Sequence, residues 1–293
     1  NFETASGAVP KGVSRALQAR MALPDLPEGS ISRQIKEPMM SNRITAGMLA
    51  IGDELLSGRT KDKNIGHLAT MLTAVGIELK EVRIVADEED DIVAALNALR
   101  GRYTYVFTSG GIGPTHDDIT ADAVSKAFGV RCIHDPRAMK LLADSYASRN
   151  MDFNETRQRM ARMPEGSELI ANKVSVAPGF IISNVHVMAG APSVFETALD
   201  VVLPTLRTGT ILKSQAIHCP FGEGIIGGPL REIQKAHPET IIGSYPKIVD
   251  GGYAVELIVR SKNDAAIEAA ASDVRAMFDA LHSAANLKQA PAG

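Results

Sequence analysis

The sequence contains no tryptophan, and only 4% of its 293 residues are aromatic, so it offers few side chains on which nucleic-acid bases could stack. Its net charge of −3 provides no basic surface for a phosphate backbone. No stretch approaches the ~18 consecutive apolar residues of a membrane span. We therefore expect neither a nucleic acid nor a membrane as a partner.

Cysteine is also scarce. Cys132 and Cys219 are the only two, and neither has a second cysteine or a histidine at the spacing of a zinc site. They predict neither a disulfide framework nor a zinc centre. A reducing compartment fits this pattern, and we expect a cytoplasmic protein.

Residues 1–43 mix proline, glycine, serine and both charge signs without a hydrophobic period, and they lack the apolar core of a secretory signal. We expect them to be a disordered extension. Met39 and Met40 directly precede the first expected strand, so a native start there, with residues 1–38 foreign to the protein, is compatible with the pattern.

Residues 44–206 alternate apolar strand-like runs with amphipathic helical runs, which predicts an α/β domain with a mostly parallel sheet. A linker at 204–209 leads to residues 211–283. Their β-α-β-β-α pattern predicts a small α+β domain, with a glycine-rich turn at 221–228 and a frayed tail after Leu281. The main expected elements are strands 44–51, 77–85, 103–108, 174–180 and 185–188, and helices 120–128, 136–149, 154–162 and 193–203.

Between strand 103–108 and helix 120–128 the chain reads Ser-Gly-Gly-Ile-Gly-Pro-Thr-His-Asp-Asp-Ile-Thr. Backbone N–H groups of such a turn, together with a helix N-terminus, favour an anion such as phosphate. Two carboxylates, Asp117 and Asp118, would repel that anion unless a divalent cation lay between them. The stretch therefore predicts metal plus phosphate, and a plain turn with a capped helix is the alternative.

Further acids follow the first two strands. Asp53 and Glu54 come after strand 44–51, and Asp87 comes after strand 77–85. Since ligands bind at the carboxyl edge of open α/β sheets, these acids are expected beside the glycine turn. A purely structural alternative is that Asp87 caps the helix that follows.

Other polar groups are weaker candidates. His116 could ligate a metal or be a solvated turn residue. We expect Arg157, Arg159 and Arg162 to be solvated, since most helical charges have no specific partner. The turn 190–193 opens a helix and is a second possible anion site.

Three spaced motifs resemble the MoaB/Mog molybdopterin-binding domain family. They are Ile-Gly-Asp-Glu-Leu-Leu-Ser-Gly from Ile51, with Asp62 and Asn64; the glycine turn from Ser109; and the pair Ala-Pro-Gly-Phe from Ala177 and Met-Ala-Gly-Ala-Pro-Ser from Met188. The most similar versions are the competence/damage-inducible CinA-like branch and the domain fused to some FAD synthases. The resemblance spans roughly residues 45–281, including a KH-like small domain.

This resemblance implies a three-layer MogA-like domain with a ligand groove at the carboxyl edge of its sheet. It implies metal-dependent hydrolysis of a nucleotide pyrophosphate such as ADP-ribose, with Mg²⁺, Mn²⁺ or Co²⁺. The alternatives are binding of molybdopterin or another pterin phosphate, adenylyl transfer in molybdenum cofactor biosynthesis, and a non-catalytic nucleotide-binding module. Relatives are dimers or trimers, so we expect a homo-oligomer with a small-molecule ligand.

The chain departs from the family pattern in two ways. Ile112 stands where dedicated molybdenum-cofactor enzymes usually have threonine, and Asp53-Glu54 stand where they usually have Asp-Arg. Losing an arginine beside a phosphate weakens the molybdopterin interpretation. The C-terminal amidase domain of many CinA proteins is not expected within these residues.

The prediction assigns catalysis to Asp87, Asp118 and Glu54, and metal binding to Asp117 and Asp118. The predicted ligand- and phosphate-binding residues are Asp53, Ser57, Gly58, Asn64, Ser109, Gly110, Gly111, Gly113, Pro114, Thr115, Thr120, Pro178, Gly179, Gly190 and Pro192.

Overall fold

The computed structural model describes residues 43–249 and 252–289. The expectation of a disordered extension falls on residues outside these ranges. None of the helices in the described ranges is long and apolar enough to cross a membrane.

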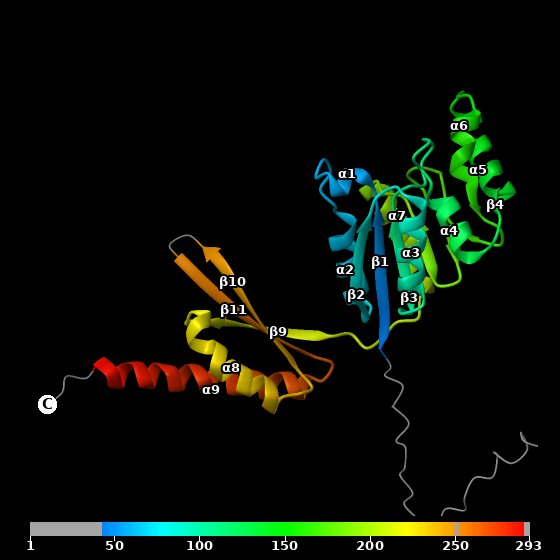
Figure 1. Cartoon of the computed structure of the whole chain (residues 1–293). Coiled ribbons are helices and arrows are strands. Elements are labelled where there is room, and N and C mark those ends of the chain that lie inside the picture. Colours follow the sequence, from blue (N-terminus) through cyan, green and yellow to red (C-terminus); the bar gives the residue numbers. More distant parts are fainter. Residues whose placement is uncertain (1–42, 250–251, 290–293) are drawn as a thin grey trace, which may run out of the picture. The chain divides into compact units, whose positions relative to one another are not determined.

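A six-stranded sheet with the order β2-β1-β3-β8-β7-β6 forms the centre of the first folded part (Figure 1). The neighbours β2, β1, β3 and β8 are parallel, whereas β7 runs antiparallel to β8 and to β6. This topology confirms the predicted α/β class with a mostly parallel sheet. The strands are β1 (Ile44–Ile51), β2 (Ile77–Val85), β3 (Tyr105–Ser109), β6 (Glu168–Ile170), β7 (Gly179–Ile182) and β8 (Val185–Met188).

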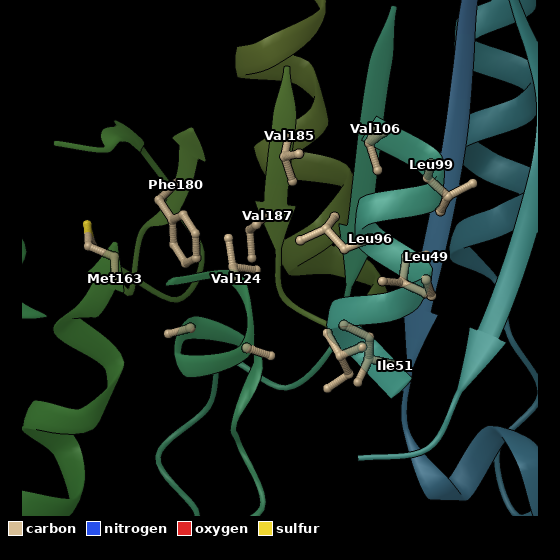
Figure 2. Packing of buried hydrophobic residues seen from close by; sticks show 14 of the residues in the cluster. Leu49, Ile51, Leu96, Leu99, Val106, Val124, Met163, Phe180, Val185 and Val187 are labelled. Carbon is tan, nitrogen blue, oxygen red and sulfur yellow. The ribbon is translucent and has the colours of Figure 1, made fainter. Parts of the chain in front are cut away.

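Helices cover both faces of this sheet, which gives three layers. Along β1, Met48 belongs to the core under α2 and α7, while Leu49 belongs to the core under α3, α4 and α5. Figure 2 shows Leu96 and Leu99 of α3 beside Leu49 and Val106 of the strands. Burial on both faces explains why β1 is apolar almost throughout. The helices are α2 (Asn64–Ala74), α3 (Glu89–Arg100), α4 (Thr120–Phe128), α5 (Pro136–Ser148) and α7 (Pro192–Val202).

Several predicted boundaries are confirmed, including both ends of β1, β2 and α4. The C-cap of α4, Gly129, has a φ of 67°, the left-handed conformation in which glycine is favoured at a helix end. Asp62 accepts a hydrogen bond from the Ile65 N–H at 2.7 Å, and it thereby satisfies a donor in the first turn of α2.

The helix predicted at 154–162 is wrong in its second half. A short helix, α6 (Glu155–Gln158), continues as the 3₁₀ turn η2 (Arg159–Ala161). The chain then enters β5 (Arg162–Pro164), which pairs with a strand that the sequence analysis missed, β4 (Cys132–His134). Pairing of β4 with β5 supplies backbone hydrogen bonds that the local pattern could not reveal.

The strand predicted at 174–180 begins only at Gly179. Val176 has a φ of 64°, a left-handed conformation that is unfavourable for a β-branched residue and incompatible with a strand. After β1, Asp53–Leu56 form the one-turn helix α1 (Figure 1).

The remaining described residues form the predicted β-α-β-β-α unit, and their antiparallel sheet has the order β10-β11-β9. The prediction of a glycine-rich turn at 221–228 is wrong. The helix α8 begins at Glu223, buries Ile226 and contains Pro229 in its interior. Nor does the last helix end near Leu281. The elements are β9 (Lys213–Cys219), α8 (Glu223–Ala236), β10 (Ile241–Val249), β11 (Gly252–Ser261) and α9 (Asp264–Gln289).

Candidate active site

A cleft of about 390 Å³ lies at the carboxyl ends of β1, β2, β3 and β8. Eight residues that the sequence analysis proposed line it, namely Glu54, Asp87, Gly110, Gly111, Gly113, Asp117, Asp118 and Gly190. The carboxyl edge of the sheet therefore brings together side chains that are far apart in the sequence, as the topology requires.

The glycine turn has no room for side chains. Gly110 has a φ of 112°, and a Cβ there would lie 2.1 Å from the Ile51 carbonyl oxygen. At Gly111, with a φ of 65°, a Cβ would lie 2.1 Å from Oγ1 of Thr120. These two glycines are therefore required by the close approach of β1 and α4.

Not every N–H group of this turn is available to a ligand. The Gly110 N–H donates to the Met188 carbonyl at 3.1 Å, and the Gly113 N–H donates to Asp118 at 2.6 Å. In contrast, the N–H groups of Gly111 and Ile112 have no acceptor among the described residues, and both residues line the cleft. They are the donors best placed to bind a phosphate oxygen.

Asp118 holds the turn together. Its Oδ1 accepts from the Gly113 N–H, and its Oδ2 accepts from both the N–H and the hydroxyl of Thr115, at 2.7 and 2.5 Å. Arg159 adds bonds from its guanidinium to the carbonyl oxygens of Thr115, at 3.1 Å, and of Asp118, at 3.3 Å. The expectation of merely solvated arginines is therefore wrong for Arg159, and it is also wrong for Arg162, which forms an ion pair with Asp122.

Asp87 does not cap the following helix. Glu88 occupies the N-cap position of α3 without a side-chain bond, and Oδ2 of Asp87 instead accepts from the Asp53 N–H at 3.0 Å. Partial burial raises the pKa of Asp87 above its usual range. The carboxylates of Asp53, Glu54 and Asp117 raise this pKa further, while the hydrogen bond from Asp53 opposes the shift.

The carboxylate side chains of the cleft meet only some of the requirements of a binding site for a divalent cation such as Mg²⁺. Carboxylate oxygens are its preferred ligands, and the mutual repulsion around Asp87 would be relieved by a bound cation. However, no three His, Cys, Asp or Glu side chains within the described residues are grouped so as to hold a metal ion by themselves. Asp117 is 63% exposed, and both oxygens of Asp118 already accept hydrogen bonds. A metal at this site would need further ligands from a bound molecule.

A smaller cavity of about 50 Å³, which we call the annex, adjoins the cleft and shares Ile51, Glu54 and Gly190 with it. Asn64, Ser109 and Pro192, three of the predicted ligand residues, line the annex rather than the cleft. Lys61 and Lys63 line it as well, whereas the described residues that line the cleft include no lysine or arginine.

Several predicted ligand residues line neither cavity. Thr120 is buried and donates from its hydroxyl to the Gly110 carbonyl at 3.0 Å, and Thr115 binds Asp118, so both support the turn. Gly179 is packed against the Val187 carbonyl within the sheet. The other predicted residues outside both cavities are Asp53, Ser57, Gly58, Pro114 and Pro178. The weaker candidate His116 is 99% exposed.

Sequence reasoning missed most of the apolar wall of the cleft. Met160 reaches it from η2, and Ser175 and Ala177 reach it from the loop before β7. Val194 comes from the first turn of α7. Apart from Ala177, which begins the Ala-Pro-Gly-Phe motif, these residues carry no signal in the sequence, and only the tertiary fold brings them beside Ile112.

Residues 47–208 match the family described as "Probable molybdopterin binding domain", and this range covers more than half of the chain. The chain belongs to this family. Residues 212–285, which follow the molybdopterin-binding domain, match the family described as "FAD synthase, middle domain". The predicted resemblance to the MoaB/Mog family is thus confirmed.

Two archaeal proteins and one solved structure are similar to this chain. A protein of Pyrobaculum calidifontis is 33% identical over 217 residues, which cover 69% of this chain and 81% of the relative. A protein of Aeropyrum pernix is 31% identical over 219 residues, and the matched region covers 71% of this chain and 81% of that protein. Among solved structures, the protein CinA of unknown function from Thermoplasma acidophilum has a TM-score of 0.52 at 29% identity, covering 56% of this chain and 99% of that one.

Proposed function

We propose that this protein is a metal-dependent hydrolase of a nucleotide pyrophosphate such as ADP-ribose. The observation that carries the proposal is the composition of one cleft. It contains open N–H donors on Gly111 and Ile112 together with the carboxylates of Glu54 and Asp87. No basic side chain of the described residues lines it. A diphosphate can approach these carboxylates only with a cation between them. Mg²⁺, Mn²⁺ and Co²⁺ are suitable cations.

In this proposal Glu54 and Asp117 would hold the cation together with phosphate oxygens of the ligand. Such shared coordination is usual for Mg²⁺ at phosphate sites and suits a cleft whose described residues form no complete protein cage. A bound cation would supply charge stabilisation and a more acidic water. The nucleotide's phosphates accept hydrogen bonds from Gly111 and Ile112.

Asp87 is the base that we assign to the water. Its Oδ2 is engaged by the Asp53 N–H, which leaves Oδ1 to accept a proton. Burial and the Asp53 carboxylate raise the pKa of Asp87, which strengthens it as a base. The water oxygen bonds to phosphorus as the P–O–P bond breaks, so ADP-ribose gives AMP and ribose phosphate.

The match to the middle domain of FAD synthase supports a pyrophosphate ligand, since FAD contains the same P–O–P bond. The apolar wall of the cleft, formed by Ile112, Met160, Ala177 and Val194, supports a flat heterocyclic group beside the phosphates. That wall would equally fit a pterin. Binding of a pterin phosphate, or its adenylylation, is therefore the second candidate, and the family description favours it.

The test is incubation of ADP-ribose and of FAD with the protein and each divalent cation, followed by chromatography of the products. We expect AMP to be released only when the cation is present, and Asp87→Asn to reduce the rate by at least about a hundredfold, the usual minimum contribution of a general base. Asp91→Asn is the matched control, because Asp91 is an exposed acid in the first turn of α3.

Full activity of the Asp87→Asn variant would remove Asp87 from the mechanism. Tight binding of a pterin phosphate without nucleotide cleavage would favour the second candidate. Nucleotide binding without any product would instead identify a non-catalytic binding module.

A further inference from the structure

The annex contains a buried polar group that the proposed mechanism does not use. Asn64 is only 3% exposed, and its Nδ2 donates to Oγ of Ser109 at 2.7 Å and to the Gly190 carbonyl at 2.8 Å. Both partners line the annex, as Asn64 does. The Oδ1 of Asn64 has no hydrogen-bond partner among the described residues. A buried acceptor without a donor is unfavourable and rare in folded proteins.

Ser109 complements this acceptor. Its Oγ accepts from Asn64, so the hydroxyl proton of Ser109 remains available for an acceptor in the annex. Asn64 and Ser109 therefore offer one acceptor and one donor side by side. Hydroxyl groups suit both, because a hydroxyl both donates and accepts, and a pair of neighbouring hydroxyls provides Asn64 and Ser109 with one partner each.

A phosphate group fits the same pair poorly. An ionised phosphate would accept from Ser109, but it has no proton to donate to Oδ1 of Asn64. Glu54 and Asp62 also line the annex and would repel an anion. Lys61 and Lys63, which also line the annex and are exposed, offset these two acids, so the annex has no net positive charge for an anion.

The size of the annex sets a second limit. A volume of about 50 Å³ is well below the roughly 150 Å³ of a cavity that holds a benzene ring. Neither a base nor a sugar ring fits such a space. Hydroxyl groups at the edge of a ring do fit, while the ring and the phosphates stay in the adjoining cleft of about 390 Å³.

We propose that the annex binds the vicinal hydroxyls of a ribosyl group, with Asn64 accepting from one hydroxyl and Ser109 donating to the other. This inference rests on the proposed function in one respect, namely that the ligand of the cleft is a nucleotide. It makes the annex the part of the site that distinguishes ribosyl ligands from those that lack the diol.

The experiment is calorimetric titration of the full chain with Mg²⁺ and ADP-ribose, and with two analogues in which either ribose diol is replaced by hydrogens. We expect one analogue to bind about tenfold more weakly than ADP-ribose, the usual effect of leaving a site's polar groups unpaired. In the Ser109→Ala and Asn64→Leu variants, the preference for ADP-ribose over this analogue should fall below about twofold.

Asn184→Leu is the matched control. Asn184 also uses its Nδ2 to join two segments, through the carbonyls of Arg100 and Tyr103 at 3.0 Å each, but it precedes β8 and so lies at the opposite edge of the sheet. This variant should lose stability and keep the tenfold preference. Thermal melts of all variants identify any that fail to fold, and Ser109→Ala keeps the bond from Asn64 to Gly190.

Equal affinity of the wild-type protein for ADP-ribose and both analogues would overturn the inference and leave the annex to ordered water. A diol preference that persists unchanged in both variants would also overturn it. A preference that depends on Asn64 and Ser109, in a protein that cleaves no pyrophosphate, would support the inference while the proposed hydrolysis fails. If ADP-ribose does not bind at all, both proposals fall.

Discussion

The backbone N–H of Asp53 donates a hydrogen bond to the Asp87 carboxylate at 3.0 Å, while the side-chain carboxylate of the same Asp53 repels it. Asp53 thus fixes the position of Asp87 through its backbone and raises the pKa of Asp87 through its side chain. The backbone bond does not depend on the side chain, so a substitution at Asp53 can separate the two effects.

We predict that Asp53→Asn moves the acid limb of the pH profile of kcat/KM to lower pH. In the wild type the raised pKa of Asp87 places that limb above the ordinary value of an aspartate, about 3.9. Removing a nearby negative charge favours the ionised form of Asp87 and so lowers its pKa. The base is then available at lower pH, but it is a weaker base.

The measurement is the rate of nucleotide cleavage between pH 4 and 8 at fixed metal concentration, with Asp91→Asn as the control whose limb should not move. An acid limb that stays in place in Asp53→Asn would show that another group controls it.

The second prediction concerns Asp118, whose two oxygens accept from Gly113 and Thr115. In Asp118→Asn an amide nitrogen must face donors at one of these positions, which we expect to destabilise the turn by about 2 kcal/mol. Substrate affinity should fall with it, because the turn presents the N–H groups of Gly111 and Ile112. The metal concentration for half-maximal activity should not change.

Asp117→Asn is the comparison for this prediction, since Asp117 is exposed and lines the cleft. It should leave the thermal melting temperature unchanged and raise the metal concentration needed. If Asp118→Asn instead melts like the wild type and requires more metal, Asp118 is a metal ligand, as the sequence analysis predicted.

The sequence predicted those features that are determined locally. The strands β1 and β2 are uninterrupted runs between clear turn signals, and Gly129 marks the end of α4 by its left-handed conformation. The glycine turn was located because glycine, proline and paired aspartates are rare enough together to be informative.

What the sequence could not predict depends on contacts between distant segments. The open N–H groups are on Gly111 and Ile112 because Met188 and Asp118 occupy those of Gly110 and Gly113. The bond from Arg159 to Thr115 spans 44 residues, and the bond from Asn64 to Gly190 spans 126. Neither has a sequence signature, since an arginine or an asparagine on a helix is most often solvated.

The third prediction tests the close approach at the glycine turn. Gly110→Ala should destabilise the fold by more than about 3 kcal/mol, because the new Cβ meets a backbone oxygen and the positive φ is strained as well. Gly129→Ala should cost only about 1 kcal/mol, since Gly129 has a positive φ but a Cβ there would meet no atom of the described residues within 4 Å. Urea unfolding of both variants isolates the steric contribution, and equal losses would contradict it.

The fourth prediction concerns His186, which is 4% exposed on β8 and stacks on Phe107 with ring centroids 5.1 Å apart. Tyr105 contacts it edge-on, and its Nδ1 has no hydrogen-bond partner within the described part of the chain. Burial lowers the pKa of His186 to about 4. The imidazole is therefore neutral in the folded protein at pH 5, where an unfolded histidine, with a pKa near 6.5, is mostly charged.

The unfolded state thus binds the proton more readily than the folded state between pH 6.5 and pH 4, so the free energy of unfolding should fall as the pH falls through this window. The contribution of His186 alone is about 3 kcal/mol at the lower limit. His186→Phe keeps an aromatic ring on Phe107 and has no proton to bind. Urea unfolding at pH 7 and pH 4.5 should therefore show a smaller loss of stability in the variant than in the wild type, and equal losses would mean that His186 is protonated in the folded state or reached by water.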